Sequence, residues 1–587
     1  MIEYMIFPRH ALALAIVLLL QTGPRLELMG ADQPAALETR VRQPVALGLA
    51  NDGRLLLAAN RRSGTISVVD TRTLRLLPEI AAGRGLSDLI ITPHQERILV
   101  CDEPAGELIS LHRQEDRFDV AHRLPVGGSP VSVQVDEDGP RCTVACLWPR
   151  RLATIALSPH PTVTRQIDLP FPPLKQCRLG KGKLVVADAF AGGLALIDMD
   201  KGQIQSSFNL PIHNIRGLAL SVDGRHLLVT HQTLRASATA SFDDIHWGNL
   251  LTNNIRSLSV STLMESGADP LRDSDLLHLG EAGHGTADPG GIVVSGKRLF
   301  VALSGVHQLA IGREQGDRWQ YVDVGRRPTA VVASADGSRI YVANTFSDSI
   351  SVIDAKAGKS IAEISLGPRP TPSKPDLGEA LFYEARLSHD GWLSCHSCHS
   401  DGHSNSRLAD TLGDGSYGTP KRIPSLHGVG ETGPWAWNGS MSRLETQVRK
   451  SIESTMQGPK PTDAQVEELT AYLRTLLPAR PRADFQDHPD RSAIERGRDV
   501  FARQGCSRCH TPPFYTSTKT FDVGLSDERG LKLFNPPALR GVSQGGPYFH
   551  DGRAVTLEEV FTSHQHQLER QLAKRDLHDL LEFLNSL

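Results

Sequence analysis

Most of the first 370 or so residues alternate between apolar and polar positions, which is the pattern of β-strands with one buried face. The clearest stretch, RPTAVVASADGSRIYVANTFSDSISVIDAKAGKSIAEISLG, lies near residue 328 and contains four short apolar runs separated by turn residues. A similar stretch, QPVALGLANDGRLLLAANRRSGTISVVDTRTLRLLPEI, starts at Gln43. The pattern therefore predicts antiparallel sheets of four strands.

This four-strand phrase repeats along the chain. Weaker copies contain ERILVCDEPAGELISL, SPVSVQVDEDG, GKLVVADAFAGGLALIDMDKGQ, IRGLALSVDGRHLLVTH and PGGIVVSGKRLFVALSG. The spacing of roughly 40 to 45 residues is the length of one blade of a β-propeller. Residues 37–368 are therefore predicted to form a seven-bladed β-propeller, and the phrase IYVAN resembles the repeats of YVTN-type propellers in bacterial surface and exported proteins.

The fifth repeat is longer than the others by roughly 30 residues, which predicts a loop insertion that projects from one face of the propeller. Its extra segment, HQTLRASATASFDDIHWGNLLTNN, contains His231, His246 and Trp247. These side chains could contact a ligand or the second half of the chain, and an ordered surface loop is the simpler interpretation. The propeller itself says little about activity, because this fold mostly serves as a rigid platform.

The pattern changes to a helical period after the Pro-rich segment GPRPTPSKPDLG, residues 367–378, which is predicted to be a linker. Five amphipathic stretches follow: LGEALFYEARLS, LETQVRKSIESTM, DAQVEELTAYLRTLL, SAIERGRDVFARQ and LERQLAKRDLHDLLEFLNSL. Their layout is duplicated, since a helix, a Cys-x-x-Cys-His motif and a GPWAWNG or GPYFHDG segment occur twice. We therefore expect two small, mainly α-helical domains, residues 376–480 and 491–587.

Each helical domain carries one Cys-x-x-Cys-His motif. Structural zinc uses cysteine pairs about 15 to 20 residues apart and needs no histidine after the second cysteine, and a thioredoxin-like pair lies near a βαβ pattern, which is absent here. Covalent haem c needs this arrangement, because two thioethers hold the porphyrin and place the next histidine under the iron. Two covalently bound haem c groups in cytochrome c-like domains are therefore predicted. The residues that would hold them are Cys395, Cys398 and His399, and Cys506, Cys509 and His510.

Charge and the amino terminus narrow the class of protein further. The formal net charge of -3 gives no sign of nucleic-acid binding. Residues 1–31 contain an apolar run from Ala11 to Leu20, which predicts a signal peptide or an N-terminal anchor and therefore a periplasmic location. In an exported protein the remaining cysteines can form disulfides or stay as buried thiols, and the sequence leaves both open. These cysteines are Cys101, Cys142, Cys146 and Cys177.

The carboxy-terminal half also resembles a known family. LGEALFYEARLSHDGWLSCHSCHSDG, RIPSLHGVGETGPWAWNGSMSRLETQ, GRDVFARQGCSRCH and FNPPALRGVSQGGPYFHDGRAVTLEEV are similar to segments of bacterial di-haem cytochrome c peroxidases and their MauG-like relatives. The resemblance runs through nearly all of residues 376–587. It implies a first haem whose distal side is open to peroxide, a six-coordinate second haem that supplies electrons, and a tryptophan between them. By register, that tryptophan is Trp437, and Gln447 matches the distal-side glutamine.

Three positions depart from the family pattern. The distal ligand of the second haem, a methionine or tyrosine in the family, is replaced by His564, with His566 close by, and imidazole is a sound iron ligand. Thr455 stands where the family has the distal glutamate; its hydroxyl cannot shuttle a proton at neutral pH, and Glu453, the nearest carboxylate, is predicted to face elsewhere. Ile423 stands where an asparagine helps to bind calcium, so calcium is only weakly supported.

These residues predict an exported, peroxidase-like di-haem oxidoreductase. Hydrogen peroxide or a related oxidant would react at the first haem, Trp437 would relay electrons, and a small redox protein would supply them through the second haem. Two alternatives stay open: an electron-transfer di-haem cytochrome without peroxidase turnover, and MauG-like oxidation of a partner protein docked on the propeller. His403 and His427 are interpreted as loop residues, although either could reach the first iron.

Overall fold

The computed structural model describes residues 38–93, 97–114, 117–137, 139–316, 318–413, 415–486 and 488–587. The predicted export segment, residues 1–31, lies outside the described residues. Within the described part, none of the helices has the length and apolar character needed to cross a membrane.

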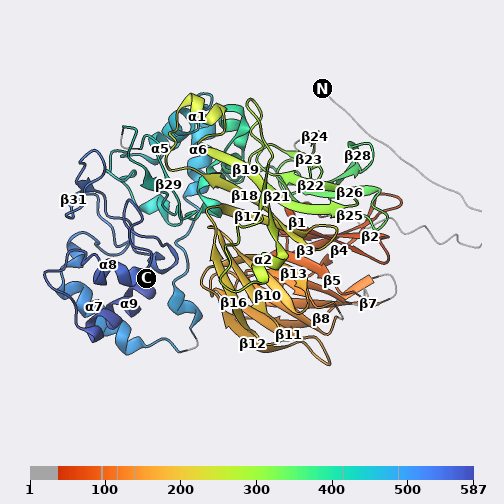
Figure 1. Ribbon diagram of the computed structural model, residues 1–587, viewed down its shortest axis with the longest axis horizontal. Helices are drawn as coiled ribbons and strands as arrows, with labels where there is room; N and C mark the ends of the chain where they lie inside the picture. The colour runs from red at the N-terminus through yellow and green to blue at the C-terminus, as the bar shows by residue number, and fades with distance from the viewer. Residues whose placement is uncertain are drawn as a thin grey trace, which may run out of the picture. The chain divides into compact units, whose positions relative to one another are not determined.

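Seven four-stranded antiparallel sheets follow one another along the chain, each built from four consecutive strands (Figure 1). The first strand of each sheet contacts the first strand of the next, and β1 also contacts β25, so the seven sheets close into a ring. The predicted seven-bladed β-propeller is therefore confirmed. Its strands, blade by blade, are β1 (Pro44–Ala50), β2 (Leu55–Asn60), β3 (Thr65–Asp70), β4 (Arg75–Ala81); β5 (Leu86–Ile91), β6 (Arg97–Asp102), β7 (Glu107–Gln114), β8 (Arg117–Pro125); β9 (Pro130–Val135), β10 (Arg141–Cys146), β11 (Arg151–Ala156), β12 (Thr162–Asp168); β13 (Pro173–Gly180), β14 (Lys183–Asp188), β15 (Gly193–Asp198), β16 (Gln203–Asn209); β17 (His213–Leu220), β18 (His226–Leu234), β19 (Leu251–Ser259), β20 (Asp275–His278); β21 (Pro289–Ser295), β22 (Arg298–Leu303), β23 (Gln308–Gly312), β24 (Gln320–Asp323); β25 (Pro328–Ala333), β26 (Arg339–Asn344), β27 (Ser349–Asp354) and β28 (Lys359–Ser365).

The middle strands of the blades explain the continuous apolar runs in the repeats. Every residue of β2 and β3 is buried, whereas the residues of the outermost strand β4 are half-buried or exposed. A middle strand is covered on both faces by neighbouring blades, so both of its faces must be apolar. One hydrophobic cluster, for example, joins Leu57 and Ile66 of the first blade to Val100 and Ile109 of the second.

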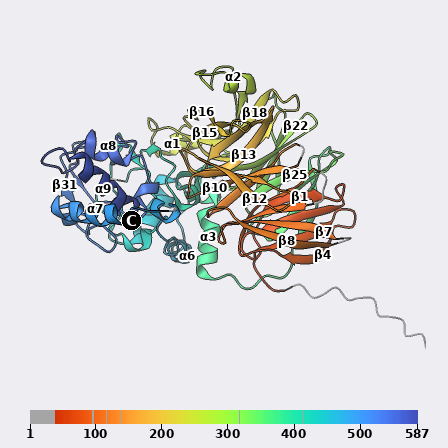
Figure 2. The ribbon, with the colours of Figure 1, turned by 90° about the horizontal axis from the view of Figure 1, so that it is seen from below.

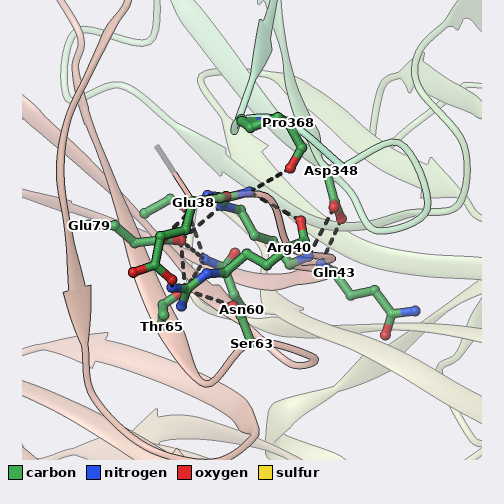
Figure 3. A network of polar contacts seen from close by, with 12 residues as sticks. Glu38, Arg40, Gln43, Asn60, Ser63, Thr65, Glu79, Asp348 and Pro368 are labelled. Atoms are coloured by element: carbon green, nitrogen blue, oxygen red, sulfur yellow. Dashed lines mark hydrogen bonds and ion pairs between the residues drawn. The ribbon is translucent and has the colours of Figure 1, made fainter. Parts of the chain in front are cut away.

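Side chains tie the first and last blades together. Each sheet is continuous in sequence, so the ring closes without a strand shared between its ends. Figure 3 shows the polar network at this closure, with Glu79, Asp348 and Pro368 labelled. The side chain of Arg42, which belongs to this network, is fully buried. Its guanidinium donates to Glu79 at 2.9 Å and to the carbonyl of Pro368 at 3.4 Å, while the backbone N–H groups of Arg42 and Gln43 donate to Asp348 at 2.9 and 2.7 Å.

The predicted insertion of the fifth blade lies between β18 and β19 and contains helix α1 (Phe242–His246). A second short helix, α2 (Val260–Met264), follows β19. The insertion is not a plain surface loop, because His246 contacts the helical half of the chain: its Nδ1 lies 2.7 Å from Oδ2 of Asp390.

The helical half begins within the segment predicted to be a linker. Helix α3 starts at Lys374, with Ser373 as its N-cap and Pro375 in its first turn, where a missing N–H costs nothing. A second difference concerns the last helix, which begins only at Lys574, so residues 568–573 are not helical. The remaining elements are α3 (Lys374–Phe382), α4 (Cys395–Cys398), α5 (Leu444–Lys450), α6 (Asp463–Leu473), α7 (Arg491–Arg503), α8 (Leu557–Thr562), α9 (Lys574–Asn585), and the two-residue strands β29 (Leu408–Ala409), β30 (Lys421–Arg422), β31 (Phe521–Asp522) and β32 (Leu533–Phe534).

The two helical segments share the same helix packing. Helix α3 contacts α6 in the first, as Figure 2 also shows, and α7 contacts α9 in the second. A glycine allows each close approach: a Cβ atom on Gly378 would lie 1.9 Å from the carbonyl oxygen of Glu468, and one on Gly497 would lie 1.9 Å from that of Asp579. The repeated glycine therefore has the same steric role in both copies.

Candidate haem sites

The first Cys-x-x-Cys-His motif lies against the propeller. Helix α4 carries both cysteines and is capped by Ser394. The hydroxyls of Ser394 and Ser397 each donate to Asp288 at 2.6 Å, and Nε2 of His213 donates to the carbonyl of Ser397 at 2.9 Å. Ser394, Ser397 and Asp288 are all at least 96% buried, with exposed fractions of 1%, 0% and 4%. Propeller side chains therefore fix the loop that carries the first motif.

His399 presents one ring nitrogen as a metal ligand. Its Nδ1 donates to the carbonyl of Pro424 at 2.9 Å, so a neutral ring has its lone pair on Nε2. Burial lowers the pKa of His399 to about 4, so the ring is neutral at pH 7. Cys395 and Cys398 are not joined in a disulfide. All three groups are therefore in the chemical state from which a covalently attached, histidine-ligated group can form.

A cavity of about 400 Å³ brings together six residues predicted from the sequence. Its walls are mostly apolar, with side chains such as Leu444, Val448 and Leu469. Apolar walls with a few polar groups are typical of cofactor sites. The predicted residues in its lining are Cys395, Cys398, His399, Trp437, Gln447 and Thr455.

The polar groups of this cavity fit a haem. Lys421, Arg422 and Arg540 supply positive charge in the lining, as two propionates require. Nε of Arg422 and Oε1 of Gln447 are buried without a hydrogen-bond partner among the residues that the structure describes. Buried polar atoms rarely stay unpaired, so both atoms indicate a bound group. Haem c, attached through the two thiols and ligated by His399, satisfies this donor set.

Trp437 lies where the two helical segments meet. Its indole N–H donates to the carbonyl of Arg422 at 2.9 Å, and its own carbonyl accepts the N–H of Asn535 at 2.8 Å. The N–H of Arg422 in turn donates to the carbonyl of His550 at 2.6 Å, and the rings of Trp437 and His550 are 6.4 Å apart. A residue held by both segments is suitably placed to connect two redox centres.

The wall that carries Gln447 and Thr455 contains a π-helical turn. Helix α5 continues into this turn over residues Ser451–Thr455. Such turns are rare and often occur at functional sites. The hydroxyl of Thr455 donates to the carbonyl of Thr411 at 3.1 Å and accepts from Nζ of Lys450 at 3.1 Å. Glu453 is not part of the described cavity lining, which agrees with the prediction that it faces elsewhere.

The second motif has the same proximal arrangement in more open surroundings. Nδ1 of His510 donates to the carbonyl of Tyr515 at 3.0 Å, which again leaves the lone pair on Nε2, and burial lowers the pKa of His510. Ser507 and Arg508 between the two cysteines are exposed. Cys506 and Cys509 are free thiols, so this motif is also ready for haem attachment.

His564 and His566 share one neighbour beyond the end of helix α8. Their rings lie 5.4 and 5.3 Å from the ring of Phe549, in edge-to-face contacts. Burial and, second to it, the charge of His510 lower the pKa of His566 to about 4. Both histidines thus come after the last residue of helix α8 in the chain and do not lie on the surface of that helix. The assignment of His564 as the iron ligand stays a prediction.

His403 and His427 line the first cavity together. Both ring nitrogens of His403 have partners, since Nε2 donates to the carbonyl of Gln544 and Nδ1 accepts from the hydroxyl of Ser425, each at 2.9 Å. Nδ1 of His427 donates to the carbonyl of Leu477 at 2.9 Å. In this arrangement His403 links the first helical segment to Gln544 of the second and has no lone pair left for iron.

Sequence reasoning missed Asp401, which follows the first motif by two residues. Its carboxylate lies 2.5 Å from the guanidinium of Arg216 and accepts the hydroxyl of Tyr383 at 3.1 Å, and the guanidinium of Arg327 lies 3.9 Å away. Burial would raise the pKa of Asp401, but the charges of Arg216, His396 and Arg327 outweigh it and hold this pKa well below its usual range. No sequence signal indicated which arginines of the propeller would meet this carboxylate.

The remaining cysteines are free thiols. Cys101, Cys142 and Cys146 are buried in one hydrophobic cluster of the propeller, and Cys177 is half-buried. Burial raises the pKa of Cys146 and of Cys177 to about 12, so these thiols stay protonated at neutral pH. The sequence left disulfides and buried thiols open for these cysteines, and the structure has thiols.

Comparison with known proteins agrees with this geometry. Residues 372–488 match the family model described as di-haem cytochrome c peroxidase. The methylamine utilization protein MauG of Methylorubrum extorquens is 28% identical over 282 residues, which cover 37% of this chain and 78% of that protein. Cytochrome c551 peroxidase of Nitrosomonas europaea is 26% identical over 315 residues, which cover 42% of this chain and 91% of that protein. The resemblance to the di-haem cytochrome c peroxidase and MauG-like family is confirmed.

The carboxy-terminal half is therefore a peroxidase-like di-haem oxidoreductase, as the sequence predicts. Among solved structures, a hydrazine synthase chain of Kuenenia stuttgartiensis covers 55% of this chain and 99% of its own length, at 21% identity and a TM-score of 0.49. The family match spans the first Cys-x-x-Cys-His motif, and the residues of that motif line the cavity.

Proposed function

We propose that this chain is an exported di-haem c-type oxidoreductase in which hydrogen peroxide or a related oxidant reacts at the first haem. Electrons would come from a small redox protein and enter through the second haem. When bound, the haem at His399 would supply the iron that reacts with the oxidant, and the haem at His510 would supply an electron store.

One observation carries the proposal: His399, Trp437 and Gln447 line the same cavity. The proximal ligand, the relay and a polar group for the oxidant are therefore available at one site. The amide nitrogen of Gln447 donates to the hydroxyl of Ser451 at 3.2 Å, and the amide oxygen has no partner in the described part of the chain. That oxygen can accept a hydrogen bond from a peroxide O–H and so orient the oxidant.

Trp437 would connect the two segments. The carbonyl of Arg422 accepts the indole N–H, and the N–H of Asn535 holds the Trp437 backbone, so the residue is fixed where the two segments meet. A rigid aromatic side chain between two redox centres shortens each electron-transfer step.

The direct test uses purified holoprotein that has been half-reduced. After peroxide is added, we expect consumption of peroxide together with oxidation of both haems in the visible spectrum. Trp437→Phe should slow reoxidation of the second haem by at least about tenfold, which corresponds to ~1.4 kcal/mol of barrier. Trp319→Phe, in the propeller with its indole on the carbonyl of His278, is the matched control and should leave the rate unchanged. Two low-spin irons that ignore peroxide would contradict the proposal.

A second function, electron transfer without peroxidase turnover, is favoured by a different observation. Among the described residues that line the cavity there is no Asp or Glu, and the hydroxyl of Thr455 already donates to Thr411. A general acid–base group for O–O cleavage is thus missing from the described lining. Thr455→Glu separates the two functions: faster peroxide consumption in this variant indicates an enzyme limited by that group, and no change indicates an electron-transfer protein.

Export belongs to the proposal as well, because haem c is attached outside the cytoplasm and residues 1–31 have the pattern of an export signal. Fractionation of a cytochrome-maturing bacterial host tests it. We expect haem-stained protein in the periplasmic or membrane fraction, and haem-free protein confined to the cytoplasm would contradict export.

A further inference from the structure

Three potential metal ligands meet where the insertion of the fifth blade contacts the first helical segment. His246 ends helix α1, and His389 and Asp390 lie in the turn that precedes the first Cys-x-x-Cys-His motif. Nδ1 of His246 lies 2.7 Å from Oδ2 of Asp390, and Nε2 of His389 lies 3.1 Å from that oxygen and 3.4 Å from Nδ1 of His246. In the part of the chain that the structure describes, this is the one group of three or more His, Cys, Asp or Glu ligand atoms that lie within 4.8 Å of one another.

We propose that His246, His389 and Asp390 bind a divalent zinc ion that links the propeller to the first haem segment. Zinc bonds of about 2.0–2.1 Å in tetrahedral geometry place neighbouring ligand atoms about 3.3 Å apart. The separations of 3.1 and 3.4 Å are close to this value, and the 2.7 Å between His246 and Asp390 would widen on binding. Two imidazoles and one carboxylate suit zinc, whereas calcium and magnesium prefer oxygen ligands. A water molecule would complete the four ligands.

The hydrogen-bonding roles of the two imidazole rings favour a bound ion at this point. Without one, Nδ1 of His246 would have to donate to Oδ2 of Asp390 at 2.7 Å and also accept from Nε2 of His389 at 3.4 Å. A neutral imidazole nitrogen can fill only one of these two roles. With an ion, each nitrogen instead directs a lone pair at the positive charge, and the carboxylate neutralises part of that charge. The arrangement of all three side chains is then favourable.

Both sides of the site are held by their surroundings. The indole N–H of Trp392 donates to the carbonyl of His246 at 3.2 Å, and the N–H of Gly285 donates to the carbonyl of Asp390 at 2.7 Å. The N–H of His389 donates to the carbonyl of Met456 at 3.0 Å. Ligands that are already ordered lose little conformational entropy when an ion binds.

Aromatic side chains cover the open side of the site. The ring of Phe242 lies 4.2 Å from that of His389, and the ring of Trp247 lies 5.2 Å from that of His246. Phe242 and Trp247 are 54% and 63% exposed, which is unusual for such large apolar side chains. An apolar cover around a metal site restricts water and strengthens the ligand bonds.

The zinc would act as a structural clamp and would take no part in the haem chemistry. The turn with His389 and Asp390 leads within five residues to Cys395, and Met456 follows the π-helical turn of the cavity wall. The ion would thus hold the propeller insertion against two segments that shape the first haem cavity.

Metal content and affinity of the holoprotein test the proposal. Chelator treatment removes a protein-bound zinc ion but leaves covalent haem iron in place. On adding zinc sulfate, we expect about one zinc ion per chain by elemental analysis, measured beside iron, and a rise in the unfolding temperature. His246→Ala and His389→Ala should weaken zinc binding by more than the ~10–100-fold that loss of an outer partner of a metal site causes.

Two further variants make the result decisive. His226→Ala changes a histidine of β18 in the same blade and should bind zinc like the unchanged protein. Asp390→Asn keeps a hydrogen-bond acceptor for the imidazoles but removes the charge, so it tests the site even if a histidine variant fails to fold. Equal zinc affinity in all variants, or no zinc binding by the unchanged protein, would overturn the proposal. Neither result depends on whether peroxide is turned over.

Discussion

The two haem-attachment motifs hold their histidine in the same way and have different neighbours. In both, Nδ1 of the histidine donates to a backbone carbonyl, Pro424 for His399 and Tyr515 for His510. The first motif is covered by the propeller, with Ser397 fully buried on Asp288. Duplicated sequence therefore fixes the proximal ligand in each copy, while the propeller makes the two copies unequal.

The second motif keeps its hydrogen bonds within its own segment. Nε of Arg508 donates to the carbonyl of Gly505 at 3.3 Å. The hydroxyl of Thr511 donates to the carbonyl of Ser507 at 3.1 Å. Arg508 and Ser507 are exposed. An enclosed centre suits a reaction that must exclude water, and an exposed one suits electron exchange with another protein. The difference between the motifs thus matches the roles proposed for the two haems.

Removing the cysteines of each motif should have the largest effect. It tests whether the propeller makes the surroundings of the two motifs different. Cys395→Ala with Cys398→Ala, and Cys506→Ala with Cys509→Ala, should each lower the mass of the protein by one haem. The first pair should also lower the unfolding temperature more, because it leaves a buried cavity of about 400 Å³ unfilled. Mass spectrometry and circular dichroism measure the two effects. Equal losses of stability would mean that the propeller does not distinguish the motifs.

Loss of the predicted distal ligand of the second haem should have the next largest effect. His564→Ala is expected to convert this haem from a low-spin to a high-spin form, because the sixth ligand is lost. Visible and electron paramagnetic resonance spectra report the change, and the first haem should be unaffected. His566→Ala is the matched control, since both rings lie against Phe549. If only His566→Ala changes the spectrum, the ligand is His566.

The contact between Asp288 and the first motif should contribute a smaller, measurable stability. Asp288→Ala leaves the hydroxyls of Ser394 and Ser397 buried without an acceptor. At ~1–3 kcal/mol for each of the two groups, the free energy of unfolding should fall by about 2–6 kcal/mol. Denaturant unfolding measures the change. Asp168→Ala, which removes an exposed partner of Arg151, is the control and should cost less than about 1 kcal/mol.

The smallest effect concerns pH and again involves the first segment alone. Burial would raise the pKa of Glu384, but hydrogen bonds from His307 of the propeller and from Arg386 outweigh it and lower the pKa to about 2. Because the folded pKa is below the unfolded value of about 4.3, this stabilisation is complete above about pH 4.5 and is lost as the pH falls toward 2. It amounts to about 1–3 kcal/mol.

Glu384→Gln should therefore be less stable than the unchanged protein at pH 6 and should lose less stability on going to pH 3. Thermal unfolding at both pH values measures this difference. Glu467→Gln, in an exposed pair with Lys374, is the control, because a surface pair contributes little at either pH. An acid-induced loss of the same size in Glu384→Gln would show that another group is responsible.

Much of the fold followed from pattern alone. Four-strand repeats such as the one that contains RIYVAN and SISVID predicted β25 to β28, because the alternation of a strand and its turn residues are local properties. The Cys-x-x-Cys-His motifs and the family resemblance predicted the residues that line the first cavity, from Cys395 to Thr455. The pattern was wrong at the edges of helices, where α3 begins inside the Pro-rich segment and α9 begins late.

Only the tertiary structure decided how the two halves meet. Asp401 on Arg216, Asp288 on Ser394, and His246 beside His389 all join residues that are more than a hundred positions apart in the sequence. Charged and polar side chains carry no periodic signal, and any of many arginines or histidines could have been the partner. The residue type determines the chemistry of each group, since a histidine carries ring nitrogens and a cysteine carries a thiol. The distances between these groups depend on how both halves fold into one unit.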